Sequence, residues 1–332
     1  MKKVLINGMG RIGRLVYRIL EDDDFFEVVA INDLTDAKQL AYLLKYDTNH
    51  RTYKADISYD ENHLIINGKK VRVFAEIEPK NIDYKELDID IVFECTGKYT
   101  SEEKALLHIE AGAKKVLISA PAKGNVKTIV YNVNNDTLDG TEQIVSAASC
   151  TTNCLAPVLK VIDDNYTIKQ GFMTTIHAYT NDQVILDVAH KKDIKERRGR
   201  AGAMNIIPTS TGAANAIGLV IPSLQGKLSG KAMRVPVPDG SLIDLSLKLQ
   251  DKVTKEQINE MFKNNVNETL EYTDDPLVST DVISTTYGGI VDGLLTEVIE
   301  NDGEQLVKIV AWYDNEMGYS HQMVRTAKCL FQ

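Results

Sequence analysis

A glycine-rich turn near the start of the chain restricts the possible folds more than any other feature. Residues 4–7 are apolar and suit a buried strand, and residues 8–13 read Gly-Met-Gly-Arg-Ile-Gly. A helical stripe follows, formed by Ile12, Leu15, Val16, Ile19 and Leu20. In a G-x-G-x-x-G turn between strand and helix, Gly8 permits the tight turn, Gly10 lets the backbone approach a pyrophosphate, and Gly13 allows close helix packing.

An acidic residue closes the second predicted strand, residues 28–33. Asp33 follows the turn at about the spacing, roughly 20 residues, at which such folds carry a ribose-binding carboxylate. That carboxylate accepts hydrogen bonds from the ribose hydroxyls of NAD and repels the 2′-phosphate of NADP. A tight turn with a helix-capping aspartate is the alternative. Because strand, glycines, helix and acid agree, the sequence predicts NAD as the cofactor.

The two halves of the chain differ in their pattern. In the first half, the apolar runs 91–97 and 116–119 flank a predicted helix that begins with a capping box of Thr100 and Glu103 and stops at Gly112. Such alternation predicts parallel strands with crossover helices.

In the second half, residues 243–249 alternate apolar and polar side chains, which is typical of an antiparallel strand with one wet face. A capping box of Thr254 and Gln257 begins a helix, 306–313 suits a strand, and 323–331 carries a helical stripe. The predicted class is α/β: a Rossmann dinucleotide-binding domain plus an α+β domain with a mostly antiparallel sheet.

Composition excludes several classes of protein. The 332 residues carry a formal net charge of −9, which disfavours nucleic-acid binding as the main role. No apolar run approaches the roughly 18 residues of a membrane span, and the glycine-rich turn interrupts the apolar start that a secretion signal needs. We therefore expect a cytoplasmic protein with no membrane partner.

Four cysteines, too few for a disulfide scaffold, are Cys95, Cys150, Cys154 and Cys329. Cys150 and Cys154 lack further ligands at zinc spacing, so no metal is expected. If a helix starts at Cys150, its N-terminus lowers the pKa of that thiol and favours a nucleophile. A cysteine nucleophile also needs a base. His177 ends a predicted strand and is a candidate base, although a lone cysteine or histidine is more often structural.

A basic cluster stands out in this acidic chain: Lys191, Lys192, Lys195, Arg197, Arg198 and Arg200. It fits a solvated loop, an anion site or a subunit contact. The hydroxyl-rich segment 209–212 follows and suits a phosphate, and Arg234 is a further candidate anion ligand.

With these residues in view, the chain resembles the phosphorylating glyceraldehyde-3-phosphate dehydrogenases essentially from end to end. Residues 148–154, Ala-Ser-Cys-Thr-Thr-Asn-Cys, form the most specific matching segment, and 6–14, 174–180, 207–212 and 312–316 also match. The resemblance implies a homotetramer. It also implies conversion of D-glyceraldehyde 3-phosphate, inorganic phosphate and NAD to 1,3-bisphosphoglycerate and NADH by way of a cysteine thioester.

The same resemblance implies three parts of the chain. Residues 1–149 would form the NAD-binding Rossmann domain and residues 150–314 the catalytic domain. Residues 315–332 would form a C-terminal helix that packs back on the NAD domain. The basic cluster would belong to a loop that lines a neighbouring subunit's cofactor site.

Roles for individual residues follow from the resemblance. Cys150 is the nucleophile and His177 the base. The residues implied for the cofactor are Gly8, Gly10, Arg11, Ile12, Gly13, Asp33, Ser119 and Asn315. Those implied for the substrate and for inorganic phosphate are Ser149, Thr151, Thr180, Arg198, Thr211, Gly212 and Arg234. Arg197 is the alternative to Arg198, because the two arginines are adjacent.

Val188-Ala189 stands where many NAD-specific relatives have Leu-Pro, which leaves room for a 2′-phosphate. Because Asp33 opposes a 2′-phosphate, we expect NAD with some tolerance of NADP. The alternatives for the activity are an erythrose-4-phosphate dehydrogenase and a protein of the same fold with an added role in binding RNA or host proteins.

Overall fold

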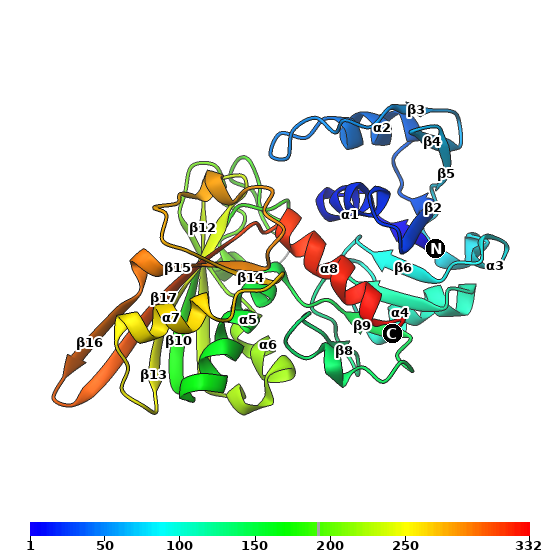
Figure 1. The fold of residues 1–332 in the computed structure, drawn as a ribbon. Helices are drawn as coiled ribbons and strands as arrows, with labels where there is room; N and C mark the ends of the chain where they lie inside the picture. The colour runs from blue at the N-terminus through cyan, green and yellow to red at the C-terminus, as the bar shows by residue number, and fades with distance from the viewer. Residues whose placement is uncertain (191–192) are drawn as a thin grey trace. The chain divides into compact units, whose positions relative to one another are not determined.

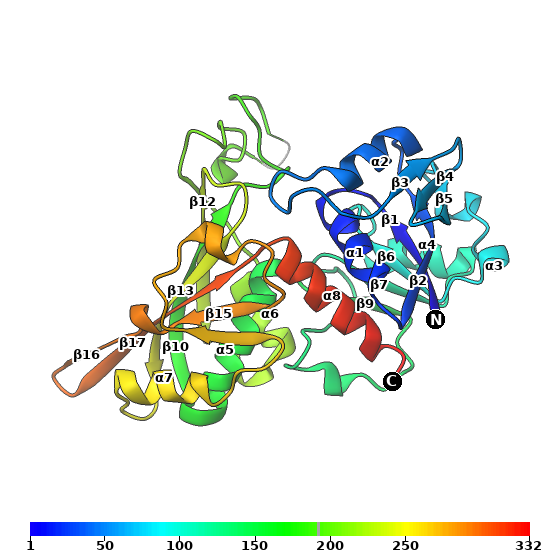
Figure 2. The same cartoon turned by 45° about the horizontal axis from the view of Figure 1, so that its top comes forward.

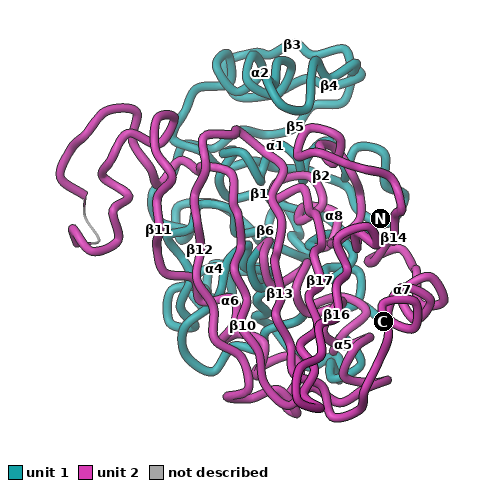
Figure 3. Tube along the Cα trace, turned by 90° about the vertical axis from the view of Figure 1, so that its left-hand side faces the viewer, with its two compact units in different colours: residues 1–129, 135–149, 323–332 teal, residues 130–134, 150–322 magenta. Residues whose placement is uncertain are grey.

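The computed structural model describes residues 1–190 and 193–332 and divides into two compact units (Figure 3). Unit 1 holds residues 1–129, 135–149 and 323–332, and unit 2 holds residues 130–134 and 150–322. Each unit has its own sheet, so each is described separately.

The sheet of unit 1 runs in the order β3-β4-β5-β2-β1-β6-β7-β9-β8 (Figure 1). Its strands are β1 (Lys2–Asn7), β2 (Phe26–Asn32), β3 (Ile57–Tyr59), β4 (His63–Ile66), β5 (Lys69–Phe74), β6 (Ile91–Glu94), β7 (Lys115–Ile118), β8 (Lys127–Thr128) and β9 (Ile144–Ser146). From β5 to β8 every neighbouring pair is parallel. The predicted Rossmann arrangement is confirmed, and it places the carboxyl ends of β2, β1 and β6 side by side.

Helices connect these strands and pack on an apolar core. They are α1 (Arg11–Glu21), α2 (Ala37–Lys45), α3 (Tyr84–Leu87) and α4 (Glu102–Ala111), with short 3₁₀ turns η1 (Pro79–Asn81) and η2 (Asn135–Thr137). Leu5, Val92 and Val116 of three adjacent strands pack in this core with Ala105 of α4. The end of the chain also belongs to unit 1, where the ring of Phe331 lies against those of Phe25 and Phe26.

The start of α4 differs by one residue from the expectation. Its N-cap is Ser101, whose hydroxyl accepts a hydrogen bond from the Lys104 N–H at 3.4 Å, rather than Thr100. The carbonyl of Thr100 accepts from the Lys123 N–H, and the Glu102 N–H donates to the Lys123 carbonyl. This bridge holds the chain extended through Ser101, so the helix cannot begin earlier. Its predicted end at Gly112 is confirmed, at a φ of 121°.

The sheet of unit 2 runs β11-β12-β10-β13-β17-β15-β14, and β16 pairs with β17. Its strands are β10 (Ile168–Ala178), β11 (Ile207–Thr209), β12 (Leu228–Val235), β13 (Ser241–Leu249), β14 (Leu270–Thr273), β15 (Gly289–Asp292), β16 (Glu297–Asn301) and β17 (Glu304–Tyr313). The pairs β10/β12 and β14/β15 are parallel, and the other pairs are antiparallel. The expected mostly antiparallel sheet is confirmed.

Helices cover this second sheet (Figure 2). They are α5 (Cys150–Tyr166), α6 (Ala213–Val220) and α7 (Lys255–Lys263), with 3₁₀ turns η3 (Ile194–Glu196), η4 (Pro222–Leu224), η5 (Ser279–Val282) and η6 (Gly293–Leu295). The last helix, α8 (Met317–Cys329), begins in unit 2 and continues into unit 1. α5 packs against β10, β13, β15 and β17, and α7 begins with the predicted capping box of Thr254 and Gln257. Within the described residues, no helix has the length and apolar character needed to span a membrane.

Candidate functional site

A thiol and an imidazole meet where α5 begins and β10 ends. Cys150 is the first residue of α5, as its sequence suggests, and its Sγ lies 3.4 Å from Nε2 of His177. The other ring nitrogen of His177, Nδ1, lies 2.7 Å from the Ala178 carbonyl oxygen. Because a carbonyl only accepts, Nδ1 carries the proton and Nε2 presents its lone pair to the thiol. This is the arrangement of a nucleophile with its general base.

Tyr313 holds the two elements of this pair together. Its hydroxyl lies 2.9 Å from Oγ1 of Thr151 on α5 and 2.8 Å from Oγ1 of Thr175 on β10. Its ring stands edge-on to that of His177, with centroids 5.9 Å apart. Sequence reasoning assigned no role to Tyr313, although it lies in the matching segment 312–316 and ends a predicted strand.

Burial decides the charge state of the pair in the free protein. Burial raises the pKa of the Cys150 thiol, although the Arg234 charge and the Thr151 backbone N–H act to lower it. Burial, followed by the Arg234 charge, lowers the pKa of His177 to about 3. The expected lowering of the thiol pKa by the helix N-terminus is therefore outweighed by desolvation. Both groups are held neutral, and the pair is poised to exchange a proton.

Arg234 reaches this pair from β12, which lies beside β10. Its Nη1 donates to the Ala178 carbonyl at 3.0 Å and to Oγ1 of Thr180 at 2.9 Å. Its Nε is buried and has no hydrogen-bond partner among the described residues. Thr180 in turn donates to Asp182 at 2.6 Å. A partly buried guanidinium whose Nε–H is unused can receive an anion beside Cys150.

The structure distinguishes the two adjacent arginines. Arg198 is buried; its Nε donates to Oγ1 of Thr209 at 3.0 Å, and its Nη1 pairs with Asp182. Arg197 is exposed and donates to the carbonyls of Lys195 and Pro208. Asp182, which the sequence reasoning did not single out, thus joins Arg198 to the chain of bonds that leads through Thr180 to Arg234.

The remaining predicted phosphate ligands lie less directly on this network. Gly212 is the N-cap of α6, and Oγ1 of Thr211 accepts from the Ala213 N–H at 3.2 Å. No hydrogen bond within the described ranges joins Thr211 or Gly212 to Cys150. Ser149 precedes α5 directly and is half-buried. Lys191 and Lys192 lie outside the described residues.

Asn315 is anchored beside the strand that carries His177. Its Oδ1 accepts a hydrogen bond from the Ser241 hydroxyl at 2.6 Å, and the Ser241 Oγ accepts from the Ala178 N–H at 3.0 Å. Ser241 was not predicted, because its role depends on the pairing of β13 with β10 and β17 rather than on local sequence.

Unit 1 carries a separate cavity of about 560 Å³ at the carboxyl end of its sheet. Its lining residues include Asn7, Gly8, Gly10, Asn32, Asp33, Leu34, Ile77, Thr96, Lys98, Tyr99, Lys104 and Leu107. Gly8 has a φ of +96°, and a Cβ on Gly13 would lie 1.9 Å from the Gly8 oxygen. Both positions therefore require glycine, and the predicted glycine-rich turn between β1 and α1 has formed.

The carboxylate of Asp33 braces this turn as well as facing the cavity. Its Oδ2 accepts from the Met9 N–H at 2.7 Å, and its Oδ1 accepts from the Thr35 N–H at 2.9 Å.

The other predicted cofactor residues lie around the same end of the sheet. Arg11 and Ile12 form the first turn of α1, but the Arg11 guanidinium is paired with Asp47. Ser119 follows β7, and its N–H donates to the Glu94 carbonyl at 3.0 Å. Exposed Leu34 and Ile77 add apolar walls, so the lining fits the adenosine part of a dinucleotide.

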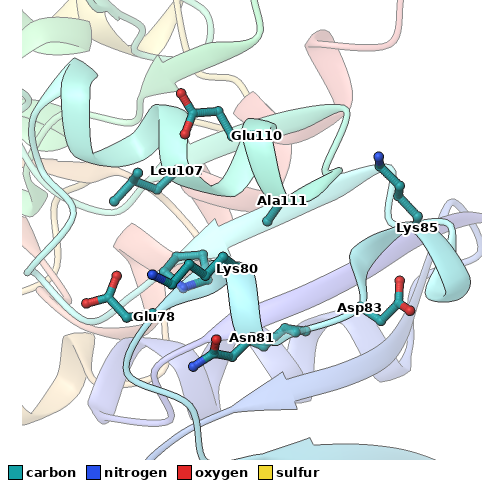
Figure 4. Close-up of a pocket in the computed structure, with 10 residues that line it drawn as sticks. Glu78, Lys80, Asn81, Asp83, Lys85, Leu107, Glu110 and Ala111 are labelled. Carbon is teal, nitrogen blue, oxygen red and sulfur yellow. The ribbon is translucent and has the colours of Figure 1, made fainter.

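A second hollow on unit 1 differs in chemistry. It lies between η1 and α4 and is lined by Glu78, Lys80, Asp83, Lys85 and Glu110 among others (Figure 4). These side chains bring charges of both signs, and no glycine-rich turn borders the hollow. The cavity at the turn is therefore the better candidate for a dinucleotide.

Two family models and several known proteins match this chain. A family model described as the NAD binding domain of glyceraldehyde 3-phosphate dehydrogenase matches residues 2–102, and one described as its C-terminal domain matches residues 149–315. A glyceraldehyde-3-phosphate dehydrogenase of Clostridium pasteurianum is 56% identical over 326 residues, which cover 98% of this chain and 97% of that protein. Those of Clostridium acetobutylicum and Streptococcus pyogenes are 55% and 52% identical, over 98% of this chain and 97% and 96% of theirs.

Proposed function

The chain belongs to the glyceraldehyde-3-phosphate dehydrogenase family, the NAD-dependent oxidoreductases of glycolysis, and we propose that it uses the Cys150–His177 pair to oxidise and phosphorylate D-glyceraldehyde 3-phosphate. The observation that carries the proposal is the 3.4 Å approach of Cys150 Sγ to His177 Nε2. At this distance the sulfur can form a covalent bond to an aldehyde while the imidazole accepts the thiol proton and returns it to the developing alkoxide.

The first step uses both members of the pair. The Cys150 sulfur attacks the aldehyde carbon while its proton moves to Nε2 of His177, and that proton then passes to the developing alkoxide. The product is a hemithioacetal on Cys150. The Nδ1–H bond to the Ala178 carbonyl keeps Nε2 aimed at the sulfur throughout this exchange.

Oxidation converts the hemithioacetal to a thioester. His177 removes the hydroxyl proton as the carbon loses its hydride, and bound NAD supplies the acceptor for that hydride. The thioester retains the energy that hydrolysis would release. Inorganic phosphate then attacks the acyl carbon, the Cys150 sulfur leaves, and 1,3-bisphosphoglycerate is formed.

Two anions must be held near Cys150 for this sequence. Arg234 and Thr180, which are hydrogen-bonded to one another, are proposed to bind the phosphate of the substrate. Arg198, Thr211, Gly212, Thr151 and Ser149 are proposed to bind the attacking phosphate. The buried location of Arg198 supports its choice over Arg197.

The cavity of unit 1 is proposed to hold the cofactor. Asp33 would accept hydrogen bonds from the ribose hydroxyls, and the turn at Gly8, Gly10 and Gly13 with Arg11 and Ile12 would hold the pyrophosphate. Ser119 and Asn315 are proposed as further contacts. The bond from Ser241 to Asn315 Oδ1 would fix that amide for recognition of a carboxamide.

A homotetramer is proposed because unit 2 exposes two apolar surfaces. One lies on the segments 185–190 and 193–206, where Ile185 and Ile194 are 85% and 89% exposed. The other surrounds a hollow of about 760 Å³ beside Phe172, Ile299 and Leu306. Burial against further copies of the chain would remove both surfaces from water, and two distinct self-contacts build a tetramer. The four free thiols suit the proposed cytoplasmic location.

One assay tests the proposed reaction. NADH formation from D-glyceraldehyde 3-phosphate should require inorganic phosphate for continuous turnover, because the thioester otherwise accumulates on Cys150. A rate with erythrose 4-phosphate that greatly exceeded the rate with the three-carbon aldehyde would reassign the substrate. Turnover that is equally fast without phosphate would disprove the acyl-transfer step.

A further inference from the structure

A row of buried polar side chains crosses unit 1 beneath the proposed cofactor cavity. It consists of Asn32, Asn7, Glu94, His108 and Tyr84, and is called here the polar belt. The first three end the adjacent parallel strands β2, β1 and β6, and the last two lie on α4 and α3. Each is less than a tenth exposed. Polar groups this deep require partners, so the row needs a physical explanation.

The first part of the polar belt ties strand ends together. Asn32 donates to Asn7 Oδ1 at 2.7 Å, and Asn7 donates to Glu94 Oε2 at 2.5 Å. Asn32 also bonds the backbone N–H and carbonyl of Glu76, each at 2.9 Å. One line of side chains therefore fixes the ends of three strands and the loop after β5.

Glu94 is the centre of the polar belt. Its carboxylate is fully buried, and its Oε1 accepts from both the backbone N–H, at 2.8 Å, and the hydroxyl of Thr96. Its Oε2 accepts from Asn7 and lies 3.3 Å from Nε2 of His108, a close polar contact without hydrogen-bond geometry. A carboxylate can accept about four such contacts, whereas an amide of the same shape can accept at only one oxygen.

The second part of the polar belt reaches α4. The Tyr84 hydroxyl lies 2.8 Å from Nδ1 of His108, and the ring of Tyr99 packs on the His108 ring with centroids 5.0 Å apart. If the Tyr84 hydroxyl donates to Nδ1, then Nε2 carries the proton and faces Glu94. The Tyr99 hydroxyl donates to the Ile77 carbonyl at 2.6 Å, so His108 also supports the wall of the cavity.

Some members of the polar belt line the cavity and others do not. Asn7 and Asn32 line it, as do Thr96 and Tyr99, which contact Glu94 and His108 respectively. Glu94 and His108 are absent from its lining. We propose that Glu94 and His108 are positioning residues that set the affinity for the adenosine diphosphate-ribose part of the dinucleotide, by holding the loops after β1, β2 and β6 in their binding geometry. This inference rests on the proposed cofactor site.

The first test is Glu94→Gln, with binding of NAD and of ADP-ribose measured by calorimetry. The amide would turn its N–H₂ group either to the N–H₂ group of Asn7 or to the backbone N–H of Thr96, and neither nitrogen can accept a hydrogen bond. We expect the Kd of both ligands to rise about tenfold or more. The KM for glyceraldehyde 3-phosphate and the alkylation rate of Cys150 without cofactor should change less than about twofold, because unit 2 carries those groups.

A double variant tests the hydrogen bond itself. Asn7→Asp alone would set two carboxylates against each other, whereas Asn7→Asp with Glu94→Gln restores one donor and one acceptor with their direction reversed. The double variant should bind ADP-ribose more tightly than either single variant. Failure of this rescue in binding, while the melting temperature is rescued, would show a purely structural role.

His108→Leu tests the other half of the polar belt, and His63→Leu is its matched control. His63 lies on β4 of the same unit, where its side chain is partly exposed and, among the described residues, bonds only to the Asp60 carboxylate. We expect His108→Leu, but not His63→Leu, to raise the Kd for ADP-ribose about tenfold and to speed hydrogen exchange in the loops after β1 and β6. A lower melting temperature with an unchanged Kd in both Glu94→Gln and His108→Leu would overturn the proposal. Asp33→Ala separates failure of this proposal from failure of the proposed cofactor site. If Asp33→Ala also leaves the Kd for ADP-ribose unchanged, the proposed cofactor site is wrong.

Discussion

The sulfur of Cys150 lies 3.4 Å from Nε2 of His177, and burial holds both groups neutral in the free protein. Their contact joins the first residue of α5 to the penultimate residue of β10. Under the proposed mechanism, catalysis therefore depends on proton transfer within this pair when the aldehyde arrives.

Replacing the nucleophile should abolish the reaction. Cys150→Ser leaves a hydroxyl that is a far weaker nucleophile than a thiol at neutral pH, so kcat should fall about a thousandfold or more. Steady-state NADH formation measures this, and calorimetric NAD binding serves as the control for folding. Activity near that of the unaltered enzyme would rule out Cys150 as the attacking group.

Replacing the base should raise the pH at which the thiol reacts. His177→Asn removes the Nε2 lone pair that accepts the Cys150 proton, so the apparent pKa of the thiol should increase. The rate of alkylation by iodoacetamide, measured against pH, reports that value. An unchanged profile would count against the pair.

Arg234 should influence the same profile from β12. Its charge lowers the pKa of Cys150, against the larger raising effect of burial. Arg234→Gln should therefore move the alkylation profile to higher pH and raise the KM for glyceraldehyde 3-phosphate. The exposed Arg197→Gln is the matched control and should do neither. A shift of equal size in both variants would mean that overall charge, rather than Arg234, sets the reactivity.

The ion pair of Arg11 and Asp47 should make stability depend on acid pH. Burial acts to raise the pKa of Asp47, but the Arg11 guanidinium and the His50 backbone N–H together lower it to about 2. This contribution is present above the unfolded-state pKa of about 4 and is lost as the pH falls from about 4 to 2. Asp47→Asn should cost about 1 to 2 kcal/mol of unfolding free energy at neutral pH, and the loss should vanish below pH 2.

Denaturant unfolding measured across this pH range tests the expectation, with the exposed Asp24→Asn as control. A cost for Asp47→Asn that stayed the same at every pH would show that the charge is not its source.

The apolar surfaces of unit 2 should be contacts between copies of the chain. Phe172 is 70% exposed on β10, and Phe172→Glu places a charge in that surface. We expect sedimentation to show dimers or monomers instead of tetramers, with unit 2 still folded. A matched control is Lys231→Glu on neighbouring β12. A wild-type chain that sediments as a monomer at micromolar concentration would refute the proposed assembly.

Several features could be predicted because their causes are local. The glycine-rich turn, the helix that starts at Cys150, the alternating strand at 243–249 and the Thr254 capping box each depend on residues that are close in sequence. Thr100 failed as an N-cap because the bridge between Ser101 and Lys123 is a contact between distant segments. Rules based on neighbouring residues could not predict this contact.

The sequence by itself determined which chemical groups are present: one thiol at a helix start, one histidine at a strand end, a phosphate-binding turn and an acid. Only the tertiary structure decided that Arg198 is buried while Arg197 is exposed, that Tyr313 joins α5 to β10, and that Glu94 lies at the centre of the polar belt. It also reversed the expected direction of the Cys150 pKa shift. The reason is that desolvation and strand register depend on many residues that are far apart in the chain, whereas helix caps and turns depend on a few sequence neighbours.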